Sequence, residues 1–166
     1  MLRFLVSFLV LLIALFTLEM LAPVQRTVIL PWTATLADLS GWLMQWFDSR
    51  VAVSGKVIRS TLSDFGVSIE PGCNGVEAMI VLLAAVVAFP APWIHKLKGL
   101  VAGFIAIQAL NLVRIVSLYY LGLWNPALFE WAHLYVWQAL IMLDALIVFL
   151  IWVRFIPAAG ETANAG

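Results

Sequence analysis

The sequence predicts an all-α integral membrane protein, and three observations support that prediction. Of the 166 residues, 64% are hydrophobic and only 11% are charged. The mean hydropathy of +1.07 leaves too little polar surface to cover a soluble domain. Four apolar runs follow one another along the chain, each near the ~20 residues that a helix needs to cross a bilayer. We therefore expect a single membrane domain with about four transmembrane helices.

Two short loops and one long segment separate the four expected helices. We place these helices over residues 2–22, 75–94, 99–123 and 133–155. The first run is too long for the apolar core of a cleavable signal, and Pro23 follows it where a small-x-small cleavage site would have to lie. Residues 23–72 form the long segment. Residues 156–166 are small and polar, and we expect a disordered tail there.

The long segment carries two further patterns. Between Thr35 and Asp48, apolar residues recur at steps of three and four, namely Leu36, Leu39, Leu43, Trp46 and Phe47. This spacing predicts an amphipathic helix that lies flat on the outer leaflet. Between residues 51 and 69, alternating apolar residues and the Ser54-Gly55 turn predict short strands or a hairpin just before the second transmembrane helix.

The basic residues of the short loops predict the orientation in the membrane. Lys96 and Lys98 occupy the loop between the second and third helices, whereas the loop at 122–132 has no Lys or Arg. Because short loops rich in Lys and Arg stay on the cytoplasmic side, we expect both termini inside and the long segment outside. Arg3 and Arg154, near the two outermost helix ends, agree with this orientation.

Three reactive or charged side chains then fall on the outer side. Cys73 is the only cysteine and lies in the turn Pro-Gly-Cys-Asn-Gly just before the second helix. Arg114 lies inside the third apolar run and His133 begins the fourth. A thiolate is favoured at a helix N-terminus, and a nearby imidazole can act as base and then as acid. The three residues therefore predict a catalytic site for thiol chemistry on the outer side.

Each of the three has a plain structural alternative. A cysteine often packs as a small apolar residue. Arg114 can extend toward the interface or pair with Asp144 and so join two helices. His133 can belong to an interfacial belt of aromatic residues. His95 lies at the opposite end of the helices and is given no catalytic part.

Four further polar residues are expected to support the site. Asn74 and Glu77 have the spacing of a capping arrangement at the start of the second helix. Asn111 belongs to a polar face of the third helix that also carries Arg114. Asp144 lies about three turns beyond His133, and we expect it to pair with Arg114 or with amides of the third helix.

Several classes of function are disfavoured. Nine basic and nine acidic residues cancel, so no basic field is available to bind nucleic acid. One cysteine cannot form an intramolecular disulfide or a site of several cysteines. Because the possible ligands are scattered singly, we expect neither zinc nor another cofactor. Four helices without repeats also offer little for a transporter.

Cys73, Arg114 and His133, in this order on successive helix ends, resemble the exosortase/archaeosortase family of membrane transpeptidases. The matching stretches are residues 69–77 (Ile-Glu-Pro-Gly-Cys-Asn-Gly-Val-Glu), 111–115 (Asn-Leu-Val-Arg-Ile) and 132–133 (Ala-His). The chain is similar to a short member of the exosortase H type. Many members have about twice as many spanning helices, so this chain holds little beyond the matching core.

The resemblance implies a catalytic triad of Cys73, Arg114 and His133. It implies substrates that are exported proteins ending in a short motif similar to Ile-Pro-Thr-Leu, a transmembrane helix and a basic cluster. Cleavage through a thioester would be followed by transfer to an unknown amine, lipid or glycan acceptor at the periplasmic face of a bacterial inner membrane. A cysteine protease that only hydrolyses, and a small membrane scaffold subunit without catalysis, remain as alternatives.

Overall fold

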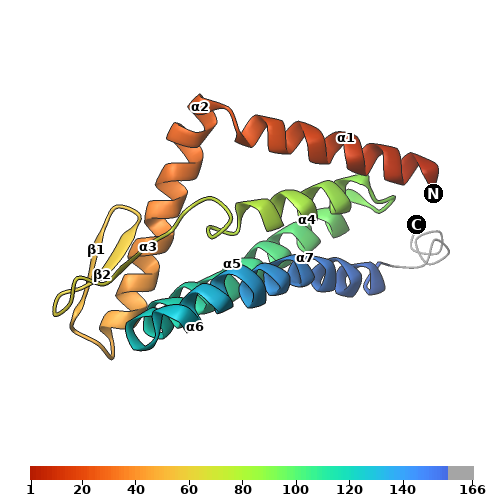
Figure 1. The fold of residues 1–166 in the computed structure, drawn as a ribbon. Helices are drawn as coiled ribbons and strands as arrows, with labels where there is room; N and C mark the ends of the chain where they lie inside the picture. Colours follow the sequence, from red (N-terminus) through yellow and green to blue (C-terminus); the bar gives the residue numbers. More distant parts are fainter. Residues whose placement is uncertain (157–166) are drawn as a thin grey trace.

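The computed structural model describes residues 1–156 of the chain; the expected tail lies outside the described residues, apart from Ile156. Four helical stretches run beside one another, and a helical arm with a small sheet lies at one end of them (Figure 1). The four stretches are α1 (Leu2–Glu19), α4 (Val76–Ala88), α5 (Trp93–Trp124) and α6 (Pro126–Trp131), which continues through the π-helical turn η2 (Ala132–Val136) into α7 (Trp137–Arg154). Helix α4 packs against α1, α5 and α7.

Three of these stretches are long and apolar enough to cross a membrane: α1, α5 and the continuous stretch from Pro126 to Arg154. Helix α4 has only 13 residues, which rise about 20 Å, so the helix expected over residues 75–94 is too long. The reason is local, because Phe89 is extended and precedes Pro90, and a residue before proline is pushed out of the helical region. The third helix correspondingly begins at Trp93, earlier than expected.

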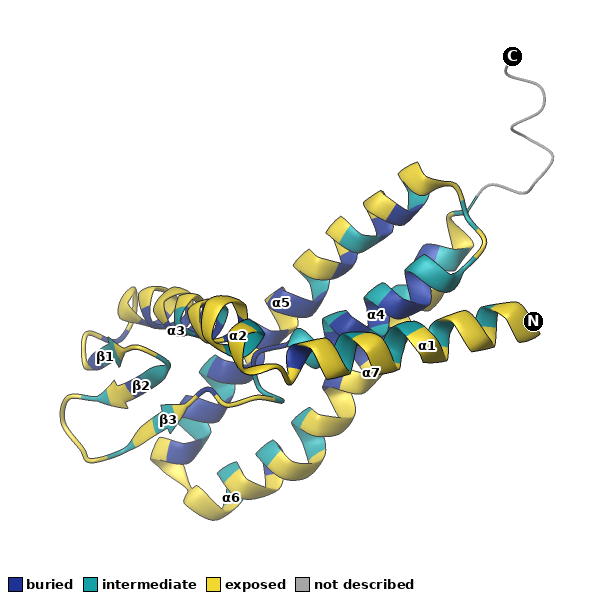
Figure 2. Cartoon of the chain, turned by 90° about the horizontal axis from the view of Figure 1, so that it is seen from above, coloured by how far each residue is buried: buried dark blue, intermediate teal, exposed yellow. Residues whose placement is uncertain are grey.

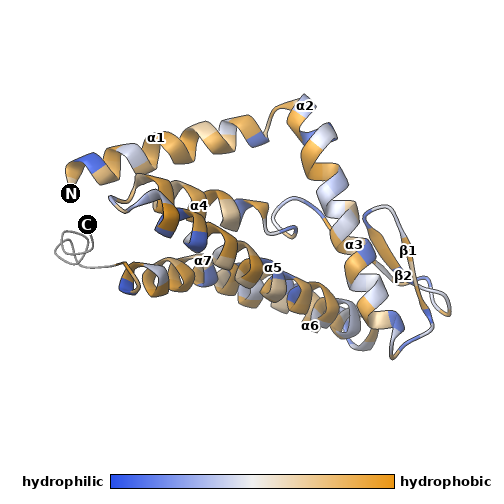
Figure 3. Cartoon of the chain, turned by 180° about the vertical axis from the view of Figure 1, so that it is seen from behind, coloured by the Kyte–Doolittle hydropathy of each residue, from blue (hydrophilic) through white to orange (hydrophobic). Residues whose placement is uncertain are grey.

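Many positions on these helices are exposed (Figure 2), and a large number of the exposed residues are large and apolar. Apolar residues cover most of α1, α4, α5 and α7, with few hydrophilic positions (Figure 3). A helix with an apolar exposed surface matches a hydrocarbon environment rather than water. The fold is therefore that of an all-α integral membrane protein, as the sequence predicted, with one small sheet added.

The helical arm consists of α2 (Ala22–Val24), the π-helical turn η1 (Gln25–Ile29) and α3 (Leu30–Gln45). Helix α3 starts earlier than the expected residue 35, and its buried face differs from the predicted stripe. Of the five apolar stripe residues only Leu36 is buried; the others remain exposed. The buried face combines Leu36 with small and flexible residues such as Ala37, Gly41 and Met44, because Gly41 lies where a side chain would meet Val53 of the sheet. That α3 lies flat on the leaflet stays a prediction.

The sheet confirms the short strands expected from the sequence. Strands β1 (Val51–Ser54), β2 (Val57–Ser60) and β3 (Gly66–Ser68) are antiparallel in the order β1-β2-β3. One face of the sheet buries a core shared with α3 and α5, which contains Leu36, Met44, Val51, Ile58, Ile69, Ile115 and Tyr119. This core holds the sheet, the arm and the C-terminal half of α5 together. Strand β3 leads directly into the Cys73 turn.

Candidate active site

Cys73 lies in a tight turn between β3 and α4. Its backbone N–H donates a hydrogen bond of 2.9 Å to the Glu70 carbonyl, which closes the turn. Gly72 and Gly75 on either side have φ values of +85° and +73°, a backbone region that residues other than glycine rarely adopt. These two glycines allow the chain to reverse on both sides of the thiol.

Asn74 fixes this turn to the helical arm. It is fully buried, and its Nδ2 donates to Thr33 Oγ1 at 3.2 Å while its Oδ1 accepts the Val76 N–H at 3.1 Å. The indole N–H of Trp32 donates to the Asn74 carbonyl at 3.3 Å. Two residues of α3 therefore hold the turn that carries the thiol.

Glu77 does not form the expected capping pair with Asn74. Its carboxylate accepts the Gly72 N–H instead, so it bridges back across the turn. The N-cap residue is Gly75, which has no side chain to cap the helix, and the Asn74 Oδ1 atom instead accepts the N–H of the first helical residue, Val76. Glu77 and Asn74 both support the turn, but through separate partners.

Arg114 of α5 is 1% exposed and contacts the same turn. Its Nη1 donates to the Gly72 carbonyl at 2.9 Å, and its Nη2 donates to Cys73 Sγ at 3.4 Å. The guanidinium therefore lies beside the thiol with its positive charge in a water-poor site. Among the described residues its Nε atom has no hydrogen-bond partner.

His133 completes the group from the opposite wall. It lies in η2, and its Nε2 is 3.1 Å from Cys73 Sγ. The ring of Phe129, one turn earlier, stacks on the imidazole with centroids 5.6 Å apart and an angle of 16°. The structure thus brings together all three residues that the sequence predicted, across separations of 41 and 60 positions from Cys73.

The environment of Cys73 acts on its ionisation in opposite directions. Burial raises the pKa of the Cys73 thiol, the Arg114 charge lowers it in part, and the Glu77 carboxylate raises it again. The net pKa lies above the ordinary value, so the turn does not by itself produce a thiolate. A neighbouring base is needed, and the imidazole nitrogen at 3.1 Å has the required position.

Asp144 does not pair with Arg114. Eleven residues separate Asp144 from His133, a rise of about 16 Å along a helix, and Arg114 lies at the level of His133. Asp144 Oδ2 and both amide atoms of Asn111 are buried and have no hydrogen-bond partner among the described residues. The expected ion pair and the expected bond to amides of the third helix are therefore both wrong for this structure.

A pocket of about 130 Å³ opens onto the thiol. Its wall combines Cys73, Arg114 and His133 with residues of β3 and with apolar side chains of α5 and α6, namely Ile115, Leu118 and Phe129. The pocket is mostly apolar, and the three reactive groups are among the residues that line it. This arrangement can hold a short peptide segment beside a nucleophile, a base and a cation.

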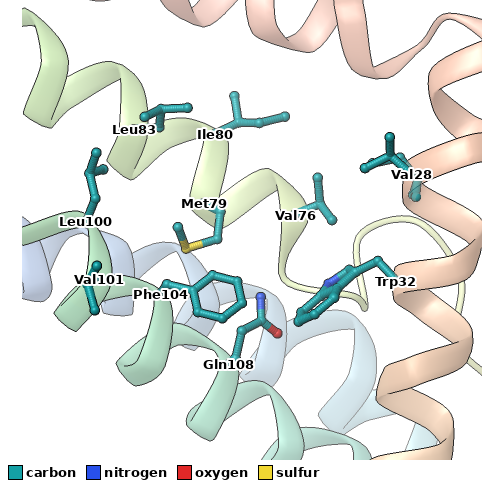
Figure 4. Close-up of a pocket in the computed structure, with 11 residues that line it drawn as sticks. Val28, Trp32, Val76, Met79, Ile80, Leu83, Leu100, Val101, Phe104 and Gln108 are labelled. Carbon is teal, nitrogen blue, oxygen red and sulfur yellow. The ribbon is translucent and has the colours of Figure 1, made fainter. Parts of the chain in front are cut away.

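A second, apolar groove of about 460 Å³ lies between the arm, α4 and α5 (Figure 4). Its lining includes Trp32, Met79, Phe104 and Gln108, and none of the three reactive residues. Its only amide side chain is Gln108. The groove therefore offers an apolar surface next to the Cys73 turn but no chemistry of its own.

Within residues 1–156, no group of three or more His, Cys, Asp or Glu side chains is placed to hold a metal ion. The thiol of Cys73, the imidazole of His133 and the guanidinium of Arg114 all line the pocket.

Sequence reasoning missed three contributors to the site. Thr33 and Trp32 lie more than 40 positions from Asn74, and no short-range pattern connects them. Phe129 precedes His133 by four residues, so the helical spacing of an aromatic ring and an imidazole was a usable signal.

The fold and the pocket define an integral membrane protein with a thiol, an imidazole and a guanidinium gathered at one end of its helices. The family model described as transmembrane exosortase (Exosortase_EpsH) matches residues 2–152. The chain therefore belongs to the exosortase family, whose general role is that of a membrane transpeptidase acting on proteins with sorting signals. Comparisons with curated proteins and with solved structures found no match.

Proposed function

We propose that this protein is a cysteine transpeptidase that cleaves the C-terminal sorting signal of exported proteins and transfers them to an acceptor. The observation that carries the proposal is the position of Cys73 Sγ, 3.1 Å from His133 Nε2 and 3.4 Å from Arg114 Nη2. A nucleophile with a base and a cation both within hydrogen-bond reach of it forms the minimal set for acyl transfer.

In the proposed first half-reaction, His133 Nε2 takes the Cys73 proton and the thiolate attacks the scissile carbonyl carbon. The carbonyl oxygen becomes an oxyanion, which the Arg114 guanidinium stabilises in the water-poor pocket. When the C–N bond breaks, the imidazolium returns its proton to the leaving amine, and a thioester links the substrate to Cys73.

In the second half-reaction an acceptor nucleophile attacks the thioester. The imidazole takes the proton of the incoming group, the C–S bond breaks, and the thiolate leaves and is reprotonated. An amine acceptor gives transfer, whereas water gives hydrolysis. Because the pKa of Cys73 lies above its ordinary value, proton transfer to His133 belongs to the attack step rather than to the resting enzyme.

Four supporting residues have different parts in this proposal. Glu77 and Asn74 position the turn through Gly72 and through α3. Asn111 lies about one turn from Arg114 on the same helix and is buried, without a hydrogen-bond partner for its side chain among the described residues. Asp144 lies too far from the thiol to touch the reacting atoms, and we assign it no chemical step.

We further propose that the pocket faces the periplasm of a bacterial inner membrane, with the substrate's own membrane helix beside the protein. Support comes from Lys96 and Lys98, which were expected in a loop but lie in the first two turns of α5, at the far end of this helix from Arg114. The matching stretches favour an exosortase H type, with an amine, lipid or glycan as acceptor.

The test is co-expression with an exported reporter that ends in a motif similar to Ile-Pro-Thr-Leu, a transmembrane helix and a basic cluster. Mass analysis of the reporter's new C-terminus compares wild type with Cys73→Ala, His133→Gln and Arg114→Lys. We expect each substitution to lower cleavage by roughly 10³-fold or more, since members of a catalytic group act together. His95→Gln, at the other histidine, is the matched control and should cleave normally.

An added mass on the product shows transfer, and a free carboxylate shows hydrolysis. A reporter that stays whole with wild type across several motifs, or equal cleavage by Cys73→Ala, would overturn the enzyme and favour the scaffold subunit.

A further inference from the structure

We propose that the free edge of β3 binds the recognition segment of the substrate as an added strand and so presents the scissile bond to Cys73. This inference rests on the proposed function and concerns how the same site selects its substrate. It arises from the position of one short strand, residues 66–68, which within residues 1–156 pairs with another strand on one side only.

Strand β3 uses every second residue to bind β2. Ile69 N–H donates to the Lys56 carbonyl at 3.0 Å, and the Phe65 carbonyl accepts the Ser60 N–H at 3.0 Å. In an antiparallel pair the intervening residues point their N–H and C=O groups the other way. Gly66 and Ser68 therefore turn their backbone groups to the free edge, and both residues are exposed.

The free edge lies at the thiol. Gly66, Ser68 and Cys73 line one pocket, together with His133 and Phe129 on the facing wall. Viewed from above, β3 is the strand of the sheet nearest to α6 (Figure 2). A peptide strand paired with Ser68 would thus lie between the sheet and the imidazole, with its backbone next to the nucleophile.

The edge is also held in place at its C-terminal end. Lys56 Nζ, in the turn before β2, donates to Glu70 at 2.6 and 2.7 Å and so contacts the residue that follows Ile69. Ile69 is 1% exposed in the core shared with α3 and α5. A fixed edge lowers the entropy lost on strand addition, because the strand that pairs with the substrate is already ordered.

An exposed strand edge is normally avoided, since it invites pairing with any other chain. Here the facing wall of α5 and α6 restricts access to the edge, and its side chains Ile115, Leu118 and Phe129 are apolar. Backbone hydrogen bonds would supply affinity and this wall would select the side chains, which is the division of labour in known strand addition. The occupant we infer is an extended segment with an apolar side chain toward the wall.

Ser68→Pro tests the edge because it removes an N–H that β2 does not use, and Val67 before it is already extended, as a residue before proline prefers. Ser68→Ala removes the hydroxyl, which donates to Glu70 at 2.7 Å, and keeps the N–H. We expect kcat/KM for reporter cleavage to be about tenfold lower for the proline than for the alanine variant. The rate of Cys73 alkylation by a small reagent reports whether the thiol site stays intact.

A substrate-side measurement needs no change in the protein. Synthetic substrates in detergent carry one backbone N-methyl group, moved residue by residue through the recognition segment. Alternate residues of a strand direct their backbone groups toward the neighbouring strand, whether the pair is parallel or antiparallel. We therefore expect N-methylation to lower the cleavage rate at every second position near the cleavage site and to leave it unchanged at the positions between.

The outcomes separate the two proposals. If wild type cleaves no substrate, the proposed function fails. If wild type cleaves but N-methylation has no period of two, or Ser68→Pro cleaves as well as Ser68→Ala, the strand addition is overturned while the enzyme stands. If Ser68→Pro loses Cys73 alkylation as well as cleavage, the substitution has damaged the thiol site and does not test the edge. The N-methyl series with the wild-type protein then decides, and a loss of cleavage at every second substrate position supports strand addition.

Discussion

At Cys73 two effects of the same burial oppose each other. The pocket excludes water, which disfavours the thiolate and raises the pKa of the thiol. The same exclusion strengthens the field of the Arg114 guanidinium, which is 1% exposed and donates to Cys73 Sγ at 3.4 Å. A positive charge placed there stabilises negative charge that develops during attack, so its benefit is largest when the oxyanion forms.

This balance predicts the pH dependence of thiol alkylation. In wild type the rate should rise with a midpoint above that of a short peptide with one cysteine in the same detergent. Arg114→Gln should move the midpoint higher, because the cation that lowers the pKa is gone, and Glu77→Gln should move it lower, because a carboxylate that raises it is gone. Alkylation rates between pH 6 and 11, at a fixed reagent concentration, give these midpoints.

A wild-type midpoint below that of the peptide would contradict the assignment of a neutral resting thiol. It would mean that Arg114 and the helix start together outweigh burial, and that His133 does not need to remove the proton during attack.

At the scale of elements, the Cys73 turn depends on close approach between the start of α4 and α5. Gly75 has a φ of +73°, and a Cβ atom there would lie 2.8 Å from the Gln108 Nε2 atom. Gly72 has a φ of +85°, and a Cβ atom there would have no neighbouring atom within 4 Å. A side chain would therefore cause backbone strain at both glycines, but crowding only at Gly75.

Gly75→Ala should destabilise the protein more than Gly72→Ala does. Backbone strain costs about 1–3 kcal/mol at either position, and Gly75→Ala adds the displacement of Gln108. Gln108→Ala combined with Gly75→Ala should recover the crowding part and leave the strain. Thermal unfolding in detergent measures all four proteins. Equal losses for the two glycine variants, or no recovery in the double variant, would rule out the close contact with Gln108.

Elements were predictable from the sequence where local patterns decide them. The apolar runs predicted α1, α5 and α7, and alternation predicted the strands before Cys73. Helix α4 was predicted too long because hydropathy continues through residues 89–94, whereas Pro90 ends the helix. The buried face of α3 was also misjudged, because the sheet requires Gly41 and Ala37 at the contact while Trp46 and Phe47 remain exposed.

At the scale of the whole molecule, the reactive residues lie far along α5 from the basic residues Lys96 and Lys98 at its start. Arg114 contacts the Cys73 turn near one end, and Lys96 lies in the first turn at the other, where its Nζ donates to the Val87 carbonyl at 2.7 Å. Because basic loops stay in the cytoplasm, this arrangement predicts an outward-facing thiol.

Because Cys73 is the only cysteine, its accessibility can be measured without background. In a Cys73→Ala protein, Ser68→Cys should react with a membrane-impermeant maleimide in right-side-out vesicles, and Lys98→Cys should react only in inverted vesicles. Both positions are exposed, so burial does not bias the comparison. The reverse pattern would invert the proposed orientation and place the pocket in the cytoplasm.

The sequence by itself determined the membrane class, the small strands and the order of Cys73, Arg114 and His133. Hydropathy, strand alternation and residue identity are local properties, so they can be read without knowing how helices rotate against one another. The resemblance to exosortases depended on the same short stretches, and the family match supports it.

Only the tertiary structure decided which polar groups meet. Arg114 bonds Gly72 and Cys73 rather than Asp144, Glu77 bonds Gly72 rather than capping with Asn74, and the free edge of β3 lies at the thiol. Such contacts depend on helix rotation and on rise along the axis, which put Asp144 about 16 Å from His133. They also depend on packing between segments 40 or more positions apart, as between Asn74 and Thr33, for which a single sequence carries no local signal.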